Sequence, residues 1–164
     1  MRLLPLLTVL LLAVSLPATA QLTISEFLAE NRSGITDTDG DSSDWIEIHN
    51  PSADPVNLSG WSLTDNAQEL SKWIFPEVSI PAAGYLIVFA SGKDLNDPAA
   101  ELHSNFSLDS GGEYLALVAP DAITVAKDFN YQEQFEDVSY GTSITTTTET
   151  AVANPASAKW LVPS

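Results

Sequence analysis

The stretch that decides the fold reads Asp-Trp-Ile-Glu-Ile-His-Asn-Pro and occupies residues 44–51. Successive side chains of a β-strand point to opposite faces, so Ile46 and Ile48 share one face and Glu47 lies on the other. The Asn-Pro pair that follows consists of turn residues and ends the run. This pattern predicts a strand that packs one apolar face against a core.

Short β-rich runs of the same kind lie on both sides of this strand. Clusters of Gly, Pro, Asn, Asp and Ser separate them, which predicts a sandwich or a barrel of many short strands. The runs are Leu22–Leu28, Trp45–His49, Val56–Leu58, Trp61–Thr64, Lys72–Phe75, Tyr85–Ala90, Glu113–Val118 and Ile123–Phe129, with weaker candidates at His103–Phe106, Val138–Tyr140 and Lys159–Val162. The runs at 85–89 and 114–118 are apolar throughout, so we expect both faces of these strands to be covered. The one helical element that we expect is short, at Asn96–Leu102, because Pro98 limits it.

Three further motifs follow residues 44–51 in a fixed order. They are Leu-Ser-Gly-Trp-Ser-Leu at residues 58–63, Trp-Ile-Phe-Pro at residues 73–76 and Pro-Ala-Ala-Gly-Tyr at residues 81–85. Together with the strand that ends in Asn-Pro, this order resembles the lamin-tail domain family, in the form found in secreted bacterial proteins, from about Leu22 to Tyr140. The resemblance implies an all-β, immunoglobulin-like β-sandwich of about eight or nine short strands, and an interaction module without catalytic residues. We assign this domain to residues 21–141.

Residues 1–20 have the organisation of a secretory signal peptide. Arg2 precedes an apolar run from Leu3 to Leu16, and Pro17 and the small residues Ala-Thr-Ala complete the segment. The run is shorter than the roughly 20 residues that a membrane-spanning helix requires, and no later segment is long and apolar enough to span. We therefore predict cleavage before Gln21, no membrane span after cleavage, and secretion to the extracellular space or the cell envelope.

Residues 142–164 differ in composition from the domain before them. Four consecutive Thr at 145–148, with Ala, Ser, Asn and Pro around them, bury too little apolar surface to fold alone, which predicts a linker. The strand-like run Lys159–Val162 follows. Either this run pairs as an edge strand or it begins a further domain, and we favour the second interpretation.

The chain has 22 acidic and six basic residues, a formal net charge of −16 and no cysteine. The predicted signal peptide carries one basic and no acidic residue, so its removal leaves a still more acidic protein. Such a protein repels nucleic-acid phosphates and anionic membrane surfaces, and we expect neither as a partner. Disulfides are excluded, so packing alone, or packing helped by a bound ion, has to stabilise the domain.

The strongest candidate binding site is the acidic loop of residues 37–44, Asp-Thr-Asp-Gly-Asp-Ser-Ser-Asp. Asp37, Asp39, Asp41 and Asp44 offer carboxylate oxygens that can converge on one point, as Ca²⁺ requires. The loop is no EF-hand, because neither the Gly nor the Glu that such a loop requires is in place. We therefore predict a weak calcium site of the extracellular type. The alternative is an acidic turn that holds no ion.

Large aromatic residues make the second candidate site. Trp45, Trp61 and Trp73, with Tyr85 beside them in the predicted sheets, can form a partner or ligand surface on which sugars stack. The alternative places them in the core and on the sheet faces, which is the commoner use of such side chains.

No constellation of catalytic residues is recognisable in the sequence. His49 and His103 are the only histidines, and there is no Gly-x-Ser-x-Gly motif. Two histidines without cysteine do not make a zinc site of the usual kind. We therefore predict a non-enzymatic module that binds an extracellular protein or glycan. The alternative function is a carbohydrate-binding accessory module detached from an enzyme.

Overall fold

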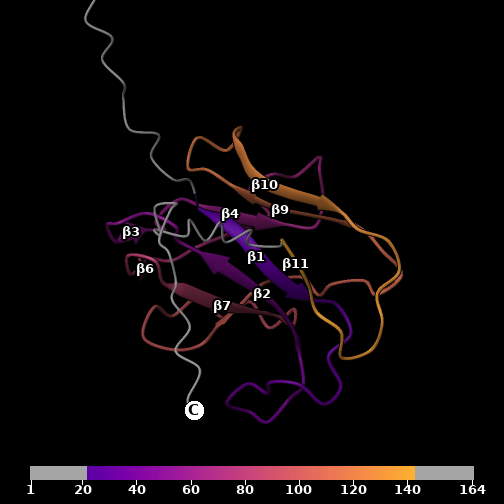
Figure 1. Ribbon diagram of the computed structural model, residues 1–164. Coiled ribbons are helices and arrows are strands. Elements are labelled where there is room, and N and C mark those ends of the chain that lie inside the picture. The colour runs from indigo at the N-terminus through magenta and orange to yellow at the C-terminus, as the bar shows by residue number, and fades with distance from the viewer. Residues whose placement is uncertain (1–21, 143–164) are drawn as a thin grey trace, which may run out of the picture.

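The computed structural model describes residues 22–142, which fold into two packed β-sheets without a helix (Figure 1). The eleven strands are β1 (Thr23–Leu28), β2 (Asp44–His49), β3 (Val56–Asn57), β4 (Ser62–Thr64), β5 (Trp73–Ile74), β6 (Ser79–Ile80), β7 (Tyr85–Ala90), β8 (Leu102–His103), β9 (Tyr114–Val118), β10 (Val125–Asn130) and β11 (Tyr140–Gly141). The architecture is an immunoglobulin-like β-sandwich, which confirms the predicted fold class.

The larger sheet has five strands in the order β11-β1-β2-β7-β8, with β2 at its centre. Ile46 of β2 lies opposite Phe27 of β1 and Val88 of β7, and all three side chains are buried. Strict alternation along β1 would put Ile24 and Phe27 on opposite faces. A β-bulge between Ile24 and Glu26 shifts the register by one residue, so both apolar side chains reach the core.

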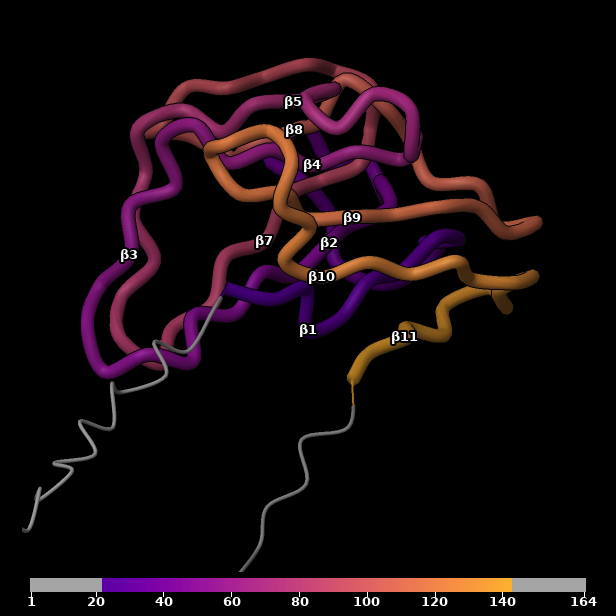
Figure 2. Tube along the Cα trace, turned by 90° about the horizontal axis from the view of Figure 1, so that it is seen from above, coloured from indigo at the N-terminus to yellow at the C-terminus, as the bar shows by residue number. Residues whose placement is uncertain are grey.

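The smaller sheet has four strands in the order β10-β9-β4-β5. Its central strand β9 is buried from Leu115 to Val118, which confirms the prediction that this apolar run is covered on both faces. The other apolar run, β7, meets the prediction only in its second half, because its first three residues are exposed or half-buried. The two-stranded ribbon β3–β6 is separate from both sheets. Figure 2 shows β3 and β11 on opposite sides of the molecule.

Aromatic contacts join the two sheets at one side of the core. The ring centroid of Phe27 in β1 lies 5.2 Å from that of Phe129 in β10, 4.8 Å from that of Tyr131 and 6.3 Å from that of Tyr140 in β11. Such pairs contribute about 0.5–1.5 kcal/mol each beyond their buried area. One residue of the larger sheet therefore holds the end of the smaller sheet and the last strand.

The structure corrects several expected elements. The helix expected at Asn96–Leu102 was wrong: the segment turns instead, with the Ala100 N–H donating to the Asp97 carbonyl over 3.1 Å and the Ala99 N–H donating to the Asp97 side chain over 2.9 Å. Pro98 and this side-chain bond favour a turn over a helix. Residues 22–142 contain eleven strands where eight or nine were expected, because no sequence run predicts the two-residue strand β6 and because the weak runs near His103 and Tyr140 form β8 and β11.

The predicted signal peptide and the run Lys159–Val162 lie outside the described residues. Among residues 22–142, no helix is long and apolar enough to cross a membrane.

Candidate functional site

The acidic loop joins β1 to β2 and is closed by the side chain of Asp37. That carboxylate is fully buried, and its Oδ1 accepts the backbone N–H groups of Asp39 at 3.1 Å and Asp41 at 2.9 Å. The Asp37 N–H donates to the Asp41 carbonyl over 3.0 Å. Gly40 has a φ of 87°, a left-handed conformation that glycine adopts without steric cost. The turn is thus fixed by its own hydrogen bonds.

An ammonium group lies where three of the carboxylates converge. The Nζ atom of Lys93 is 2.6 Å from an oxygen of Asp37, 2.7 Å from one of Asp39 and 2.9 Å from one of Asp41. The hydrogen bond from Lys93 holds the pKa of Asp37 below its usual value, and the three carboxylates raise the pKa of Lys93. The side chains of Asp39 and Asp41 remain 68% and 63% exposed. We call this group the lysine-clamped turn: Asp37, Asp39, Asp41 and Lys93.

Asp44, the fourth predicted ligand, does not belong to the group of carboxylates that lie close enough together to share an ion. It begins β2, and its Oδ1 accepts the backbone N–H of Asn31 at 3.0 Å. Burial raises the pKa of Asp44. The Asn31 side-chain amide donates to the carbonyls of Ile35 and Ser43 over 2.7 and 2.8 Å. Asp44 and Asn31 therefore hold the base of the acidic loop.

A further hydrogen bond ties the acidic loop to the segment that precedes β8. The backbone N–H of Thr38 donates to Oε2 of Glu101 over 2.7 Å. Together with Lys93, which follows β7, this bond fixes the loop from outside as well as from within. Neither Lys93 nor Glu101 was singled out in the sequence. The only signal for Lys93 was the scarcity of basic residues in so acidic a chain.

The three predicted tryptophans do not form one exposed surface. Trp73 is 2% exposed and packs edge-to-face on Phe75 with ring centroids 4.9 Å apart, so the structure places it in the core and not on the predicted ligand surface. Trp61 is half-buried against the core, and Trp45 is half-buried on the outer face of the larger sheet, opposite Phe89. The side chain of Trp73 points inward from β5, and burial of so large an aromatic side chain stabilises the core.

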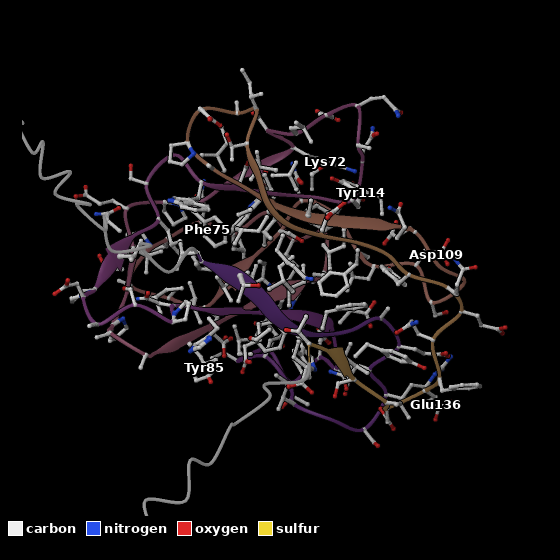
Figure 3. All side chains as sticks on the ribbon, turned by 45° about the horizontal axis from the view of Figure 1, so that its top comes forward. Lys72, Phe75, Tyr85, Asp109, Tyr114 and Glu136 are labelled. Carbon is white, nitrogen blue, oxygen red and sulfur yellow. The ribbon has the colours of Figure 1, made fainter. Side chains whose placement is uncertain are left out.

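Tyr85 is more exposed than Trp45 on this outer face. Its side chain is 49% exposed and stacks on His49 of β2, with ring centroids 4.3 Å apart. Figure 3 shows Tyr85 at the outside of the larger sheet, whereas Phe75 points between the sheets.

The second histidine makes a buried contact with a serine. Nδ1 of His103 lies 2.9 Å from Oγ of Ser91, and the imidazole stacks on Phe89 with ring centroids 5.2 Å apart. A nucleophile–histidine–acid triad needs a carboxylate bonded to the other ring nitrogen. Among the hydrogen bonds of the described residues, none runs from a ring nitrogen of His103 to a carboxylate, and His103 is 2% exposed. This pair lacks the geometry of a triad.

The fold and the site define the class of the protein: an immunoglobulin-like domain whose acidic loop is exposed. The lamin tail domain model matches residues 15–133 of the chain, and the chain belongs to this family. The family consists of immunoglobulin-like, non-enzymatic domains that generally serve as interaction modules. Comparison with curated proteins finds no match.

Proposed function

We propose that this protein is a secreted, non-catalytic interaction or structural module of the extracellular space or cell envelope, and that its partner is a protein or a glycan. The observation that carries the proposal is the lysine-clamped turn. Internal hydrogen bonds and Lys93 hold the loop in one conformation, while the side chains of Asp39 and Asp41 stay exposed. Loops fixed on a rigid sandwich are the usual carriers of binding, and a preorganised loop loses little entropy when it binds.

Secretion rests on the organisation of residues 1–20. Expression of the full chain in a host with a secretory pathway, followed by mass spectrometry of the N-terminus, tests it. We expect protein in the medium or envelope that begins at Gln21. Intact protein that begins at Met1 and stays in the cytosol contradicts secretion.

Binding through the acidic loop is tested by crosslinking the secreted protein to intact cells and matrix and identifying the partners by mass spectrometry. The informative variant is Asp39→Asn/Asp41→Asn, which keeps the size of both exposed side chains and removes their charge. We expect it to lose the crosslinks that the wild type makes. Unchanged crosslinks, or hydrolase turnover that a single carboxylate substitution abolishes, would falsify the proposal.

Calcium stabilisation of the loop stays a prediction. Asp37, Asp39 and Asp41 offer oxygen ligands of the right kind within 4.8 Å of one another. The ammonium of Lys93 supplies a positive charge at the same point, which supports the alternative of a loop held without an ion. A calcium ion has to displace Lys93, so we expect millimolar Ca²⁺ to raise the melting temperature of Lys93→Met more than that of the wild type.

The second candidate function, a carbohydrate-binding accessory module, is favoured by one observation. The stacked pair Tyr85 and His49 presents an aromatic face on the outer side of the larger sheet, and sugars stack on such faces. A glycan array probed with the wild type and with Tyr85→Ala tests it. Glycan binding that Tyr85→Ala removes and that Trp73→Phe, a change in the core, retains supports this function.

A further inference from the structure

A groove of about 510 Å³ runs along the outer edge of β7 where β8 stops short. Its apolar wall comes from Val78, Leu86, Ile87 and Leu102, and its opposite side from residues 98–101. Thr38 of the acidic loop also lines the groove. The groove therefore lies beside the lysine-clamped turn.

The backbone of β7 is open toward this groove. Strand β8 pairs with Val88 and Phe89 only, so Tyr85, Leu86 and Ile87 have no ladder partner on that side among the described residues. The chain before β8 turns away at Asp97–Ala100 instead of continuing the ladder. An unpaired strand edge is a template for another extended chain.

Two hydrogen bonds show which backbone groups point into the groove. The Gly84 carbonyl accepts the Asn50 N–H at 2.9 Å and so faces β2, whereas the Phe89 carbonyl accepts the Ser104 N–H at 2.9 Å and so faces β8. Backbone polar groups alternate along a strand. The N–H of Ile87 and both backbone groups of Tyr85 therefore point to the β8 side, beyond the end of β8.

The rim of the groove is acidic. Glu101 lines the groove and Asp97 lies in the turn beside it, and residues 94–101 contain no basic residue. The basic residue nearest in sequence, Lys93, is bonded to the lysine-clamped turn, and the ion pairs of the described residues use other carboxylates than Asp97 and Glu101. The rim thus attracts a positively charged occupant.

We propose that this groove binds an extended basic peptide of a partner protein by adding it as a strand to the edge of β7. Main-chain groups of the peptide pair with those of Tyr85 and Ile87. Alternate side chains of the peptide enter the apolar groove, and lysine or arginine side chains between them reach Glu101 and Asp97. This inference rests on the proposed function as an interaction module and names the chemistry of the partner. The walls are aliphatic and the open polar groups are backbone, which suits a peptide and offers a sugar ring no aromatic face.

The test is fluorescence polarisation with the full secreted chain and a labelled heptapeptide of alternating lysine and valine. A second peptide has the same sequence with alternate backbone nitrogens methylated, which removes hydrogen-bond donors and keeps the charge. A third has glutamate in place of lysine. We expect binding of the first peptide, affinity at least about tenfold lower for the methylated peptide and no binding of the acidic one, since each tenfold step corresponds to about 1.4 kcal/mol.

Two protein variants locate the binding. Ala99→Trp fills the exposed side of the groove, and its matched control is Ala53→Trp at an exposed position of another loop. Asp97→Asn/Glu101→Gln removes the charge of exposed Asp97 and half-buried Glu101, and its control is Asp128→Asn/Glu133→Gln, at two exposed positions away from the groove lining. We expect both groove variants to weaken binding about tenfold or more, a difference of about 1.4 kcal/mol, and both controls to leave it unchanged.

Several outcomes overturn the inference. Equal affinity for the methylated and unmethylated peptides excludes strand addition, and binding that Ala99→Trp leaves unchanged excludes this groove. If the wild type sediments as a dimer and Ala99→Trp sediments as a monomer, the edge is assigned to a second copy of the chain. If Trp160→Ser binds the peptide more tightly than the wild type, the chain's own C-terminal run competes for the edge, and the edge is assigned to that run. No peptide binding at all refutes the groove alone, because the crosslinking of Asp39 and Asp41 tests the proposed function separately.

Discussion

The two halves of β7 differ although both are apolar in sequence. The second half, from Val88 to Ala90, is buried, pairs with β8 and leads into Lys93, which holds the acidic loop. The first half, from Tyr85 to Ile87, is exposed or half-buried and has no ladder partner on its outer side within residues 22–142. The difference teaches that one strand can stabilise a loop at one end and remain open for pairing at the other, because its neighbour β8 is only two residues long.

The largest effect is expected from removing the clamp at the buried end of β7. Lys93→Met keeps most of the side-chain volume and leaves the carboxylates of Asp37, Asp39 and Asp41 without their cation. We expect Lys93→Met to lower the melting temperature more than any of the other substitutions proposed, because like charges a few ångströms apart repel and Asp37 is buried. Thermal unfolding by circular dichroism measures it. Lys127→Met is the control, since Lys127 lies over the ring of Phe129 and far in sequence from the loop. Equal melting temperatures for the two variants contradict the role of the clamp.

The next largest effect is on the free energy of unfolding, which should depend on how tightly each half of β7 is packed. Val88→Ala removes methyl groups from a fully buried site and should reduce the free energy of unfolding by about 1–2 kcal/mol. Tyr85→Ala, at a half-exposed site, should reduce it by less than about 1 kcal/mol through lost stacking on His49. Urea unfolding of both variants measures the difference. Equal losses would mean that the first half is as well packed as the second.

The two parts of the acidic loop should respond differently to pH. The pKa of Asp37 is lowered in the fold, so its contribution is present above the ordinary aspartate pKa of about 4 and is lost as the pH falls through the folded value. Burial raises the pKa of Asp44, so the folded state prefers its neutral form and loses that preference as the pH rises through the folded value. We expect Asp37→Asn to destabilise at pH 7 and to reduce the dependence of stability on acid.

Asp44→Asn should instead change the stability at pH 7 by less than about 1 kcal/mol, because the amide oxygen still accepts the Asn31 N–H and no buried charge remains. Unfolding of both variants between pH 3 and pH 7 measures this. If Asp44→Asn loses as much stability at pH 7 as Asp37→Asn, Asp44 belongs to the lysine-clamped turn.

The smallest effect is expected in the hydrogen exchange of the β7 backbone amides, which is measured on the wild-type protein. Hydrogen exchange should be fast at the amide of Ile87, which faces the open edge, and slower by about 100-fold or more at Val88, whose amide faces β2. Addition of the lysine–valine peptide should slow exchange at Ile87 selectively. Slow exchange at Ile87 in the free protein would mean that this edge is already paired.

Much of the fold could be predicted, because its signals are local. The alternation at Ile46 and Ile48 predicted β2 and its buried face correctly, and the motif order from residue 44 to residue 85 identified the family. Prediction failed for the two-residue strand β6, which is a strand only because it pairs with β3. It also failed where the side chain of Asp97 favours a turn over the expected helix.

Sequence alone determined the all-β fold and the family, because alternation and turn residues act over a few positions. It predicted that Asp37, Asp39, Asp41 and Asp44 converge, and the structure brings the first three together. Only the tertiary structure decided that Lys93, 56 residues after Asp37, supplies the cation of that turn, and that Trp73 faces inward. It also decided that, within the described residues, the first half of β7 has no strand on its outer side, because that depends on where residues 98–101 leave the sheet. Contacts between distant segments follow from how the sheets pack, and no local pattern encodes them.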